Sequence, residues 1–138
     1  MSNETEKLTI NLGVVELSQI DVLVEQGVYS NRSDFIRTAI RKDLEFQREK
    51  IEHSLTPIAG SENKNRVTMI GIMYLSKRLL DDFFYDNNKE KIKISVIGML
   101  KIDNDLSPEL FKKTVASVDV RGKVIASPEI KKLIDEMK

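Results

Sequence analysis

Near its N-terminus the chain reads Lys7-Leu8-Thr9-Ile10-Asn11-Leu12, a run in which polar and apolar residues alternate strictly. Successive side chains of a strand point to opposite faces, so this run predicts a strand with one apolar face and one polar face. The residues that follow, up to about residue 50, have the spacing of helices and offer no neighbouring strand. Because a lone strand is unstable in water, we expect it to pair, antiparallel about a two-fold axis, with the same strand of a second copy of the chain.

Two helices are expected behind this strand. The first should run from about Val14 to Gln26, with an apolar inner stripe formed by Leu17, Ile20 and Val24 at steps of three and four residues. Gly27 should end this helix, because glycine adopts the left-handed conformation without a Cβ penalty.

The second helix is expected to begin after Asn31 and to extend to about residue 50. Asn31 should cap it by accepting a hydrogen bond from the backbone N–H three residues on, while Asp34 reaches back in a variant of the capping box. A helix start can also bind an anion, although most helix caps bind nothing. The alternating strand before it favours an anion site here. The inward residues of this helix are expected to be Phe35, Ile36, Ala39, Ile40 and Leu44.

The order of these elements is a strand, a short break, a helix, then Tyr29-Ser30-Asn31-Arg32-Ser33-Asp34-Phe35-Ile36-Arg37 and a second helix. It resembles the ribbon-helix-helix family of DNA-binding proteins, of the CopG, MetJ, Arc and NikR type, over about residues 5–48. The resemblance implies an intertwined homodimer whose two-stranded ribbon enters the major groove of double-stranded DNA. One departure is Gly13, which stands where the family often has proline.

The resemblance also implies roles for individual residues. In the family, the polar strand residues read bases and the start of the second helix holds a DNA phosphate. Carried over by position, base reading falls to Lys7, Thr9 and Asn11. Phosphate binding falls to Asn31, Arg32 and Ser33.

Length and composition narrow the class of protein. The 138 residues are 41% apolar and 32% charged, as in a globular protein of one ordinary or two small domains. There is no cysteine, which excludes disulfides, zinc–thiolate sites and thiol nucleophiles. No apolar run reaches the length of a membrane span, and the polar start is unlike a signal peptide, so we expect a cytoplasmic protein with no membrane partner.

The charge balance limits how the chain could bind DNA. The net charge is zero, and residues 1–50 contain seven Lys and Arg against nine Asp and Glu. Binding should therefore depend on a few placed contacts, with Lys7, Arg32 and Arg37 on the DNA side and Glu16, Asp21, Glu25 and Glu45 facing away. Affinity for random sequence should be modest, because that term grows with the number of phosphates neutralised.

Residues 51–66 are expected to form a linker, since they contain Pro57, Gly60 and the polar run 61–65. His53, the only histidine, is interpreted as a solvated linker residue. Nickel sensing of the NikR kind, through histidines and a cysteine of the C-terminal domain, is therefore not expected, and no metal site is predicted.

The last seventy residues contain three similar units. Strands are expected at Val67–Tyr74, Ile92–Ile102 and Val118–Ala126, and their central glycines, Gly71, Gly98 and Gly122, are 27 and 24 residues apart. A helix should follow each strand. Two of these helices begin with the same Ser-Pro-Glu at residues 107–109 and 127–129, in which serine caps, proline takes the first position and glutamate favours the dipole. The first unit lacks this start.

Three units of a strand and a helix favour parallel strands stacked as in a short solenoid, similar to β-α solenoid repeats. A compact α+β arrangement with accidental similarity between the units is the alternative. In either case, residues 67–138 are expected to serve oligomerisation or to bind an effector or partner. The aromatic cluster Phe83-Phe84-Tyr85 is a candidate for that contact, although two of its three rings are expected in the core.

No enzyme is predicted. The C-terminal carboxylates have no histidine or glycine-rich phosphate loop beside them. Asp103-Asn104-Asp105 resembles a cation-binding turn, but the glycine and final glutamate of a calcium loop are missing, so we interpret it as a solvated turn.

The sequence thus predicts an α+β protein with a ribbon-helix-helix DNA-binding and dimerisation domain over 1–50, a linker over 51–66 and a β-α repeat domain over 67–138. The expected function is that of a homodimeric, sequence-specific transcriptional regulator of the CopG family type, as repressor or activator, with no cofactor. Higher oligomers could form through the C-terminal domain. Two alternatives remain: an antitoxin of a toxin–antitoxin pair, and a self-assembling module without DNA binding.

Overall fold

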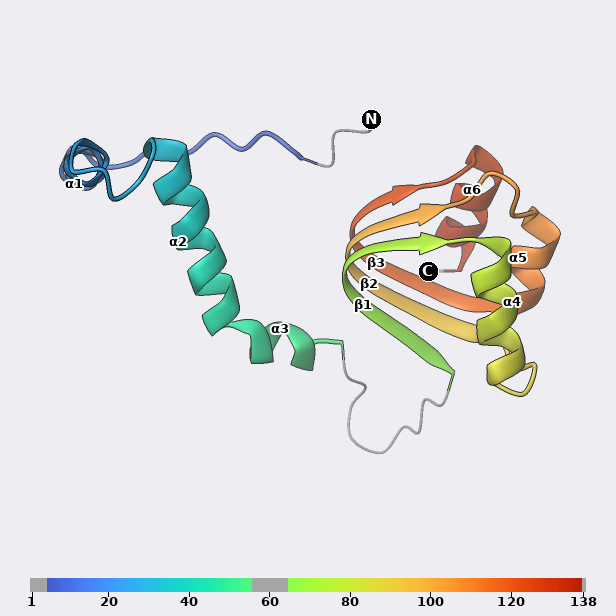
Figure 1. Ribbon diagram of the computed structural model, residues 1–138. Coiled ribbons are helices and arrows are strands. Elements are labelled where there is room, and N and C mark those ends of the chain that lie inside the picture. The colour runs from blue at the N-terminus through green and yellow to red at the C-terminus, as the bar shows by residue number, and fades with distance from the viewer. Residues whose placement is uncertain (1–4, 56–64, 138) are drawn as a thin grey trace. The chain divides into compact units, whose positions relative to one another are not determined.

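The computed structural model describes residues 5–55 and 65–137 (Figure 1). The chain forms two compact units, Met1–Lys50 and Ile51–Lys138. Over residues 5–50 of the first unit all regular structure is helical, and the second unit contains a parallel sheet with helices packed against it.

The helices of the N-terminal unit are α1, Val14–Glu25, and α2, Arg32–Phe46. Gly27 follows α1 with a φ of 75°, and its N–H donates to the carbonyl oxygen of Val24 at 3.0 Å, so it ends the helix as predicted. The prediction of one helix to about residue 50 is wrong at its end, because α2 stops before Gln47 and a short helix, α3, runs over Arg48–His53. With no glycine or proline at the break, nothing in the local sequence signals it.

The predicted strand over residues 7–12 is neither helix nor strand in this single chain. No other segment among the described residues pairs with it. That is the behaviour expected of a strand whose only suitable neighbour is its own copy.

The predicted linker is shorter than expected at its start. Residues 51–53, including the exposed His53, belong to α3. Beyond them the side chain of Arg66 donates to the carbonyl oxygen of Leu55 at 3.3 Å. Pro57, Gly60 and the polar run up to residue 64 lie outside the described residues.

Three parallel strands in sequence order form the sheet of the C-terminal unit: β1, Arg66–Leu75, β2, Ile92–Ile102, and β3, Val115–Ile125. The predicted bounds are right for β2 and three residues too late at the start of β3. The parallel order is the one that stacked β-α units require.

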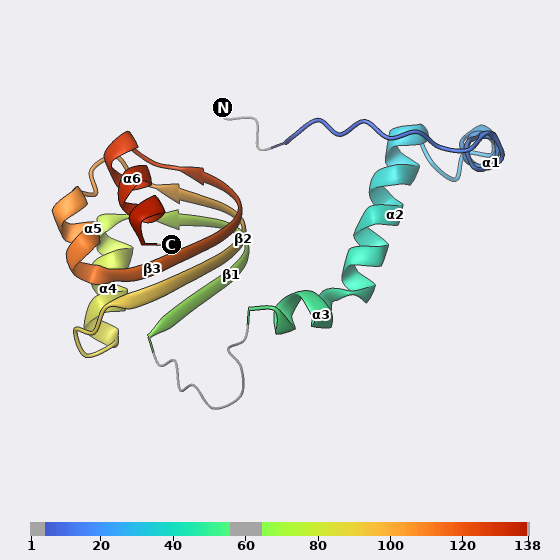
Figure 2. The same cartoon turned by 180° about the vertical axis from the view of Figure 1, so that it is seen from behind.

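The three central glycines lie side by side across the sheet, Gly71 paired with Gly98 and Gly98 with Gly122. Their φ angles are 130°, 132° and 138°, values that other residues rarely adopt. Figure 2 shows from behind that each strand turns in its middle part, the part of each strand in which its glycine stands. A Cβ at Gly98 would collide with the carbonyl oxygen of Gly71, and one at Gly122 with that of Gly98. Two of the three glycines are therefore required by contact as well as by conformation.

A helix follows each strand: α4, Lys77–Asp86, α5, Pro108–Thr114, and α6, Pro128–Glu136. The hydroxyls of Ser107 and Ser127 accept from the backbone N–H groups three residues on, at 3.2 and 3.4 Å, so both predicted caps are confirmed. The first unit does lack the Ser-Pro-Glu start, yet the Ser76 hydroxyl accepts from Leu79 N–H at 3.2 Å and caps α4, a cap that was not predicted. Lys77 and Arg78 stand there in place of the proline and the glutamate.

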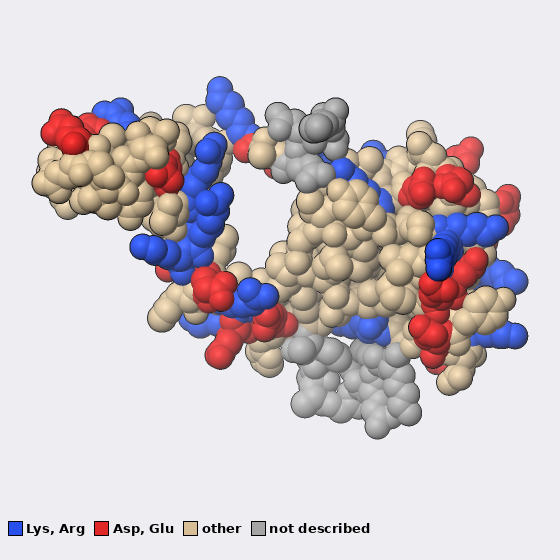
Figure 3. Space-filling model, in the orientation of Figure 1, with Lys and Arg blue, Asp and Glu red and all other residues tan. Residues whose placement is uncertain are grey.

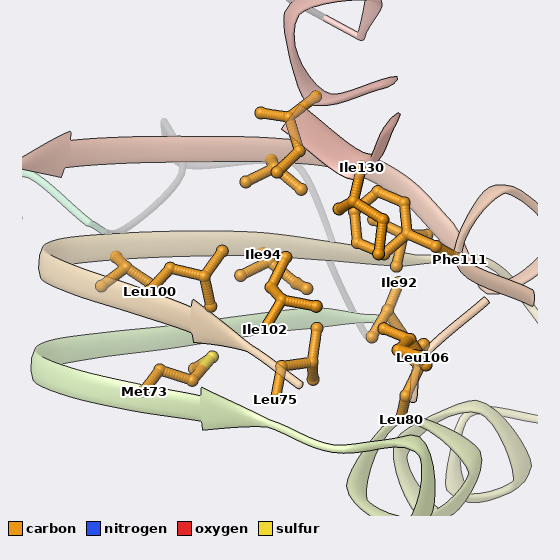
Figure 4. Packing of buried hydrophobic residues seen from close by; sticks show 14 residues of the cluster. Met73, Leu75, Leu80, Ile92, Ile94, Leu100, Ile102, Leu106, Phe111 and Ile130 are labelled. Atoms are coloured by element: carbon orange, nitrogen blue, oxygen red, sulfur yellow. The ribbon is translucent and has the colours of Figure 1, made fainter. Parts of the chain in front are cut away.

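The core of this unit lies between the sheet and the three helices (Figure 4). Phe111 of α5 is completely buried, together with Leu80 of α4, Ile130 of α6 and the inward residues of β2. Of the aromatic cluster at the end of α4, Phe83 packs against this core and Phe84 is half-buried. Tyr85 alone is exposed, over 64% of its surface. Phe83 is therefore the one ring of this cluster that packs on the core, where two were expected.

Candidate nucleic-acid interface

The N-terminal unit contains an apolar groove of about 430 Å³. Ile10 and Leu12 of the alternating run line it on one side. Helices α1 and α2 supply the rest of its apolar lining: Ile20, Leu23, Phe35, Ile36, Ala39 and Ile40. Ile10 and Leu12 thus face the same space as one side of each helix. Of the stripe predicted for α1, Ile20 lines the groove and Leu17 and Val24 do not, and of the residues predicted to point inward from α2, all but Leu44 line it.

This groove is incompletely covered in one chain. Ile20 is the one buried apolar residue that the structure describes in α1 and α2. Leu8 and Leu44, in contrast, expose 80% and 53% of their surfaces, and Ile40 is also exposed. Burial of apolar area contributes about 25 cal/mol per Å². An apolar surface that covered these exposed side chains would therefore stabilise the N-terminal unit. The apolar side of the N-terminal unit is therefore mostly exposed in the single chain.

The polar positions of the run lie outside the groove. Lys7, Thr9 and Asn11 are all exposed, and none of them lines the groove that Ile10 and Leu12 line. In this single chain the three side chains follow one another along an irregular segment, so no reading surface is assembled from them. The structure thus separates the polar side chains of the run from Ile10 and Leu12, but it does not arrange the polar side chains as a surface for reading bases.

The start of α2 is built by two side-chain hydrogen bonds. The Asn31 side-chain oxygen accepts from the backbone N–H of Asp34 at 2.8 Å, which confirms Asn31 as the cap. The Asp34 carboxylate accepts from Ser30 N–H at 3.0 Å. Asp34 therefore reaches back one residue further than a capping box requires. The backbone N–H groups of Arg32 and Ser33 lie in the first turn of α2, where a helix supplies no acceptor for them. They point out of the N-terminal end of the helix.

Arg32 has a contact that the sequence did not reveal. Its guanidinium donates from Nε and from one terminal nitrogen to the two Asp21 carboxylate oxygens at 2.7 and 2.8 Å. This bidentate hydrogen bond from Arg32 lowers the pKa of Asp21, and the same pairing raises the pKa of Arg32. The pair joins α1 to the start of α2. Asp21, expected to face away from the DNA side, is thus paired with a residue expected on that side, and spacing alone gives no signal for a pair eleven residues apart.

Positive charge in this unit gathers on α2 (Figure 3). Arg37, Arg41 and Lys42 are exposed along it, with Arg37 and Arg41 one turn apart. On α1, Glu16 reaches back and accepts from Gly13 N–H at 3.4 Å, so it helps to start that helix. The basic surface is local, as expected from a net charge of zero.

The carboxylates of the C-terminal unit form no comparable site. A side-chain hydrogen bond with Asp105 raises the pKa of Asp103, and both side chains are exposed in the turn after β2. Among the residues that the structure describes, no group of three potential metal ligands is close enough to hold an ion. Within the same described ranges, no helix has the length and apolar character needed to cross a membrane.

The N-terminal unit consists of two helices preceded by an alternating segment, and a comparison with known proteins assigns the chain to a family. A sequence model of the ribbon-helix-helix transcriptional regulator family matches residues 3–131. The chain therefore belongs to this family, and the match runs through both units. No curated protein and no solved structure matches the chain. Membership indicates a DNA-binding transcriptional regulator, and members of this family are generally not enzymes.

Proposed function

We propose that this protein is a homodimeric, sequence-specific DNA-binding transcriptional regulator. Residues 7–12 of two copies pair as an antiparallel ribbon that enters the major groove. Lys7, Thr9 and Asn11 of each copy then face the base edges, and the two starts of α2 lie against the DNA backbone.

The observation that carries this proposal is the apolar groove between the N-terminal run and the two helices. Its Ile10 and Leu12 wall belongs to a segment with no strand neighbour in its own described chain, while Leu8, Ile40 and Leu44 remain exposed around it. A second copy supplies both missing parts, a strand for the run and an apolar surface for the groove. A two-fold dimer is the simplest arrangement in which each copy covers the other.

Base reading follows from the residue types on the polar face. A lysine ammonium donates to the O6 and N7 acceptors of guanine, so Lys7 is the best candidate for a guanine contact. Asn11 carries a donor and an acceptor on one amide, which is the pattern that pairs with adenine N6 and N7. Thr9 supplies a hydroxyl and a methyl group between them, and two copies present this set twice.

Phosphate binding is assigned to the first turn of α2. The N–H groups of Arg32 and Ser33 and the positive end of the helix dipole favour an anion there. The side chain of Asn31 is already engaged in the cap, and that of Arg32 is engaged with Asp21. In this proposal Asn31 and the Arg32 side chain hold the helix start in place, and the backbone amides with the Ser33 hydroxyl contact the phosphate.

Binding to selected genomic DNA tests the proposal. Fragments retained by the purified protein are sequenced, and the affinity for one of them is compared between the wild type and the triple variant Lys7→Ala, Thr9→Ala, Asn11→Ala. Each good base contact contributes about 1–3 kcal/mol, so the variant should lose at least about 100-fold in affinity. Sedimentation should show an unchanged dimer.

The control variant is Lys112→Ala, Asn104→Ala, which removes the same charge and an amide from exposed positions of the C-terminal unit. Its affinity for the selected fragment should equal that of the wild type. Equal affinity of the triple variant and the control would show that the run does not read DNA and would overturn the proposal.

A further inference from the structure

The outer side of β1, called here the β1 edge, has no strand beside it among residues 5–55 and 65–137. Strand order places β1 and β3 at the two borders of the sheet. The border side of such a strand presents a row of backbone N–H and C=O groups that another strand can pair with. From Val67 to Leu75 the strand contains no charged residue, and Met69, Ile70 and Ile72 expose 38%, 44% and 36% of their surfaces. Figure 3 shows a largely uncharged surface where the strands turn.

The opposite border is built differently. Across the sheet, Ile70 of β1 is aligned with Arg121 of β3, and Ile72 is aligned with Lys123. One residue of β2 lies between the two members of each pair. Asp119 is charged as well, and all three side chains of β3 are exposed. Charged residues on a border strand are the usual means of keeping that border in water and unpaired. The contrast indicates that the β3 border stays solvated and that the β1 edge is covered.

We propose that the β1 edge pairs antiparallel with the β1 edge of a second copy, centred on Gly71. In this register Ile70 lies opposite Ile72 of the second copy, and Ile72 opposite its Ile70. Two apolar cross-strand pairs then form on the outer face without placing a charge against either of them. This interface is separate from the proposed ribbon and does not depend on DNA binding.

The turn of the strands at Gly71 determines the register. Two strands that turn at one residue keep their spacing on both sides of the turn only if the turning residues lie opposite each other. The position next to Gly71 is open, because a Cβ built there meets no described atom within 4 Å. At Gly98 and Gly122 the equivalent position is filled by the carbonyl of the preceding glycine. The column of glycines can therefore accept one more strand at the β1 edge.

Charge favours the two-fold pairing over stacking of β1 on β3 of the next copy. Head-to-tail stacking would continue the internal register and place Arg121 and Lys123 beside Ile70 and Ile72. It would also leave a new open edge at each step, which generates fibres, whereas the two-fold pairing closes after two copies.

Engineered cysteines test the pairing in the full-length protein, which has no cysteine of its own. The variant Ile70→Cys, Ile72→Cys places two thiols opposite each other across the proposed two-fold axis, at a separation that a disulfide can span. The matched control is Arg121→Cys, Lys123→Cys, which surrounds Gly122 as the first pair surrounds Gly71. A third variant, Ile70→Cys, Arg121→Cys, reports head-to-tail stacking. Covalent products are separated on a non-reducing gel after mild oxidation.

The first variant should give at least about tenfold more covalent dimer than the control. Any dimer formed through the N-terminal units raises the local concentration equally in both variants, so the difference belongs to the β1 edge. Equal cross-linking in the two variants, or a ladder of products from the third variant, would overturn the proposal.

Hydrogen exchange of the unmodified protein gives a test without substitutions. Peptides covering 66–75 should exchange more slowly at high than at low protein concentration, because pairing is a mass-action equilibrium, while peptides covering 115–125 should not change. Concentration-independent exchange of β1 would contradict the pairing even if the cysteine variants failed to fold. Loss of DNA binding in the triple variant at the ribbon leaves both results unchanged, so this proposal and the proposed function fail separately.

Discussion

Replacing Gly98 with alanine should destabilise the C-terminal unit far more than replacing Gly71, although the two glycines have nearly the same φ. The φ angles are 132° and 130°, so the conformational cost of a Cβ is shared, about 1–3 kcal/mol at each position. The surroundings differ. At Gly98 the added Cβ would lie 3.0 Å from the carbonyl carbon of Gly71 and closer still to its oxygen, whereas at Gly71 it meets nothing within 4 Å.

The atoms that the alanine would displace at Gly98 are backbone atoms of a paired strand, so the relief requires β1 and β2 to move apart at the turn. Backbone clashes of this kind belong with the exceptional substitutions that cost more than about 4 kcal/mol. Domains are stable by only about 5–15 kcal/mol in total, so Gly98→Ala should leave the unit close to unfolding. Gly71→Ala should remain folded with a loss limited to the conformational cost.

The assay is hydrogen exchange of peptides covering 92–102, because it reports the opening free energy of this unit alone in a chain of two units. Gly122→Ala is a second test, since it would collide with the carbonyl of Gly98 in the same way. Losses that are equal within error for Gly71→Ala and Gly98→Ala would show that the stacked glycines are not in contact, and would refute the reasoning. Measurements at low protein concentration exclude a contribution from pairing of the β1 edge.

Three further results are expected. Phe111→Ala removes a completely buried ring and should lower the free energy of unfolding, measured in urea, by about 3–5 kcal/mol. Tyr85→Ala, at an exposed position, should lower it by less than about 1 kcal/mol. Similar losses for the two variants would contradict the assignment of the core. Hydrogen bonding from Arg32 lowers the pKa of Asp21 below its ordinary 3.8, so this carboxylate stabilises the fold above that value and ceases to do so as pH falls through its lower folded pKa. The N-terminal unit of Asp21→Asn should therefore lose less stability than the wild type between about pH 5 and about pH 2 in circular dichroism melts, and parallel losses would show that the pair has no effect. Finally, we expect two copies to neutralise about two to four phosphates. A plot of the logarithm of the DNA-binding constant against the logarithm of salt concentration should then have a slope of about −2 to −4. A slope near −10 would indicate a broad basic surface in place of a few contacts.

Much of the C-terminal unit can be predicted from its sequence because its constraints are local. The β-branched and apolar runs predict the three strands, and the recurrence of Gly71, Gly98 and Gly122 at similar spacing predicts repeated β-α units with parallel strands. The turn of the strands at these glycines was not predicted. The serine caps before the prolines at 108 and 128 predict two helix starts correctly. Ser76 was missed because no proline follows it, although the hydroxyl alone makes the cap.

The N-terminal unit is less predictable because part of its structure is not local. The alternation of residues 7–12 predicts which side chains face the helices, and Ile10 and Leu12 do line the groove. Residues 7–12 form no strand in the single chain, and in the proposed dimer that strand depends on a second copy, whose position one sequence does not specify. The pairing of Arg32 with Asp21 depends on the angle at which α1 meets α2, which spacing along the chain does not contain.

The aligned glycines also separate what can vary in this repeat from what cannot. The first and second units differ in length, and the difference lies mainly outside the sheet, in the longer α4 and in the turn at Asn88 and Lys89, where both residues have positive φ. Within the sheet, β3 has one extra residue near its start, where its register against β2 shifts, while the pairing at the glycines is kept. Insertions and deletions between the strands should therefore be inherited easily, whereas a shift of one residue within a strand would bring a side chain against a neighbouring carbonyl. Related chains should differ most in the segments that join their strands and should keep glycine at the turn.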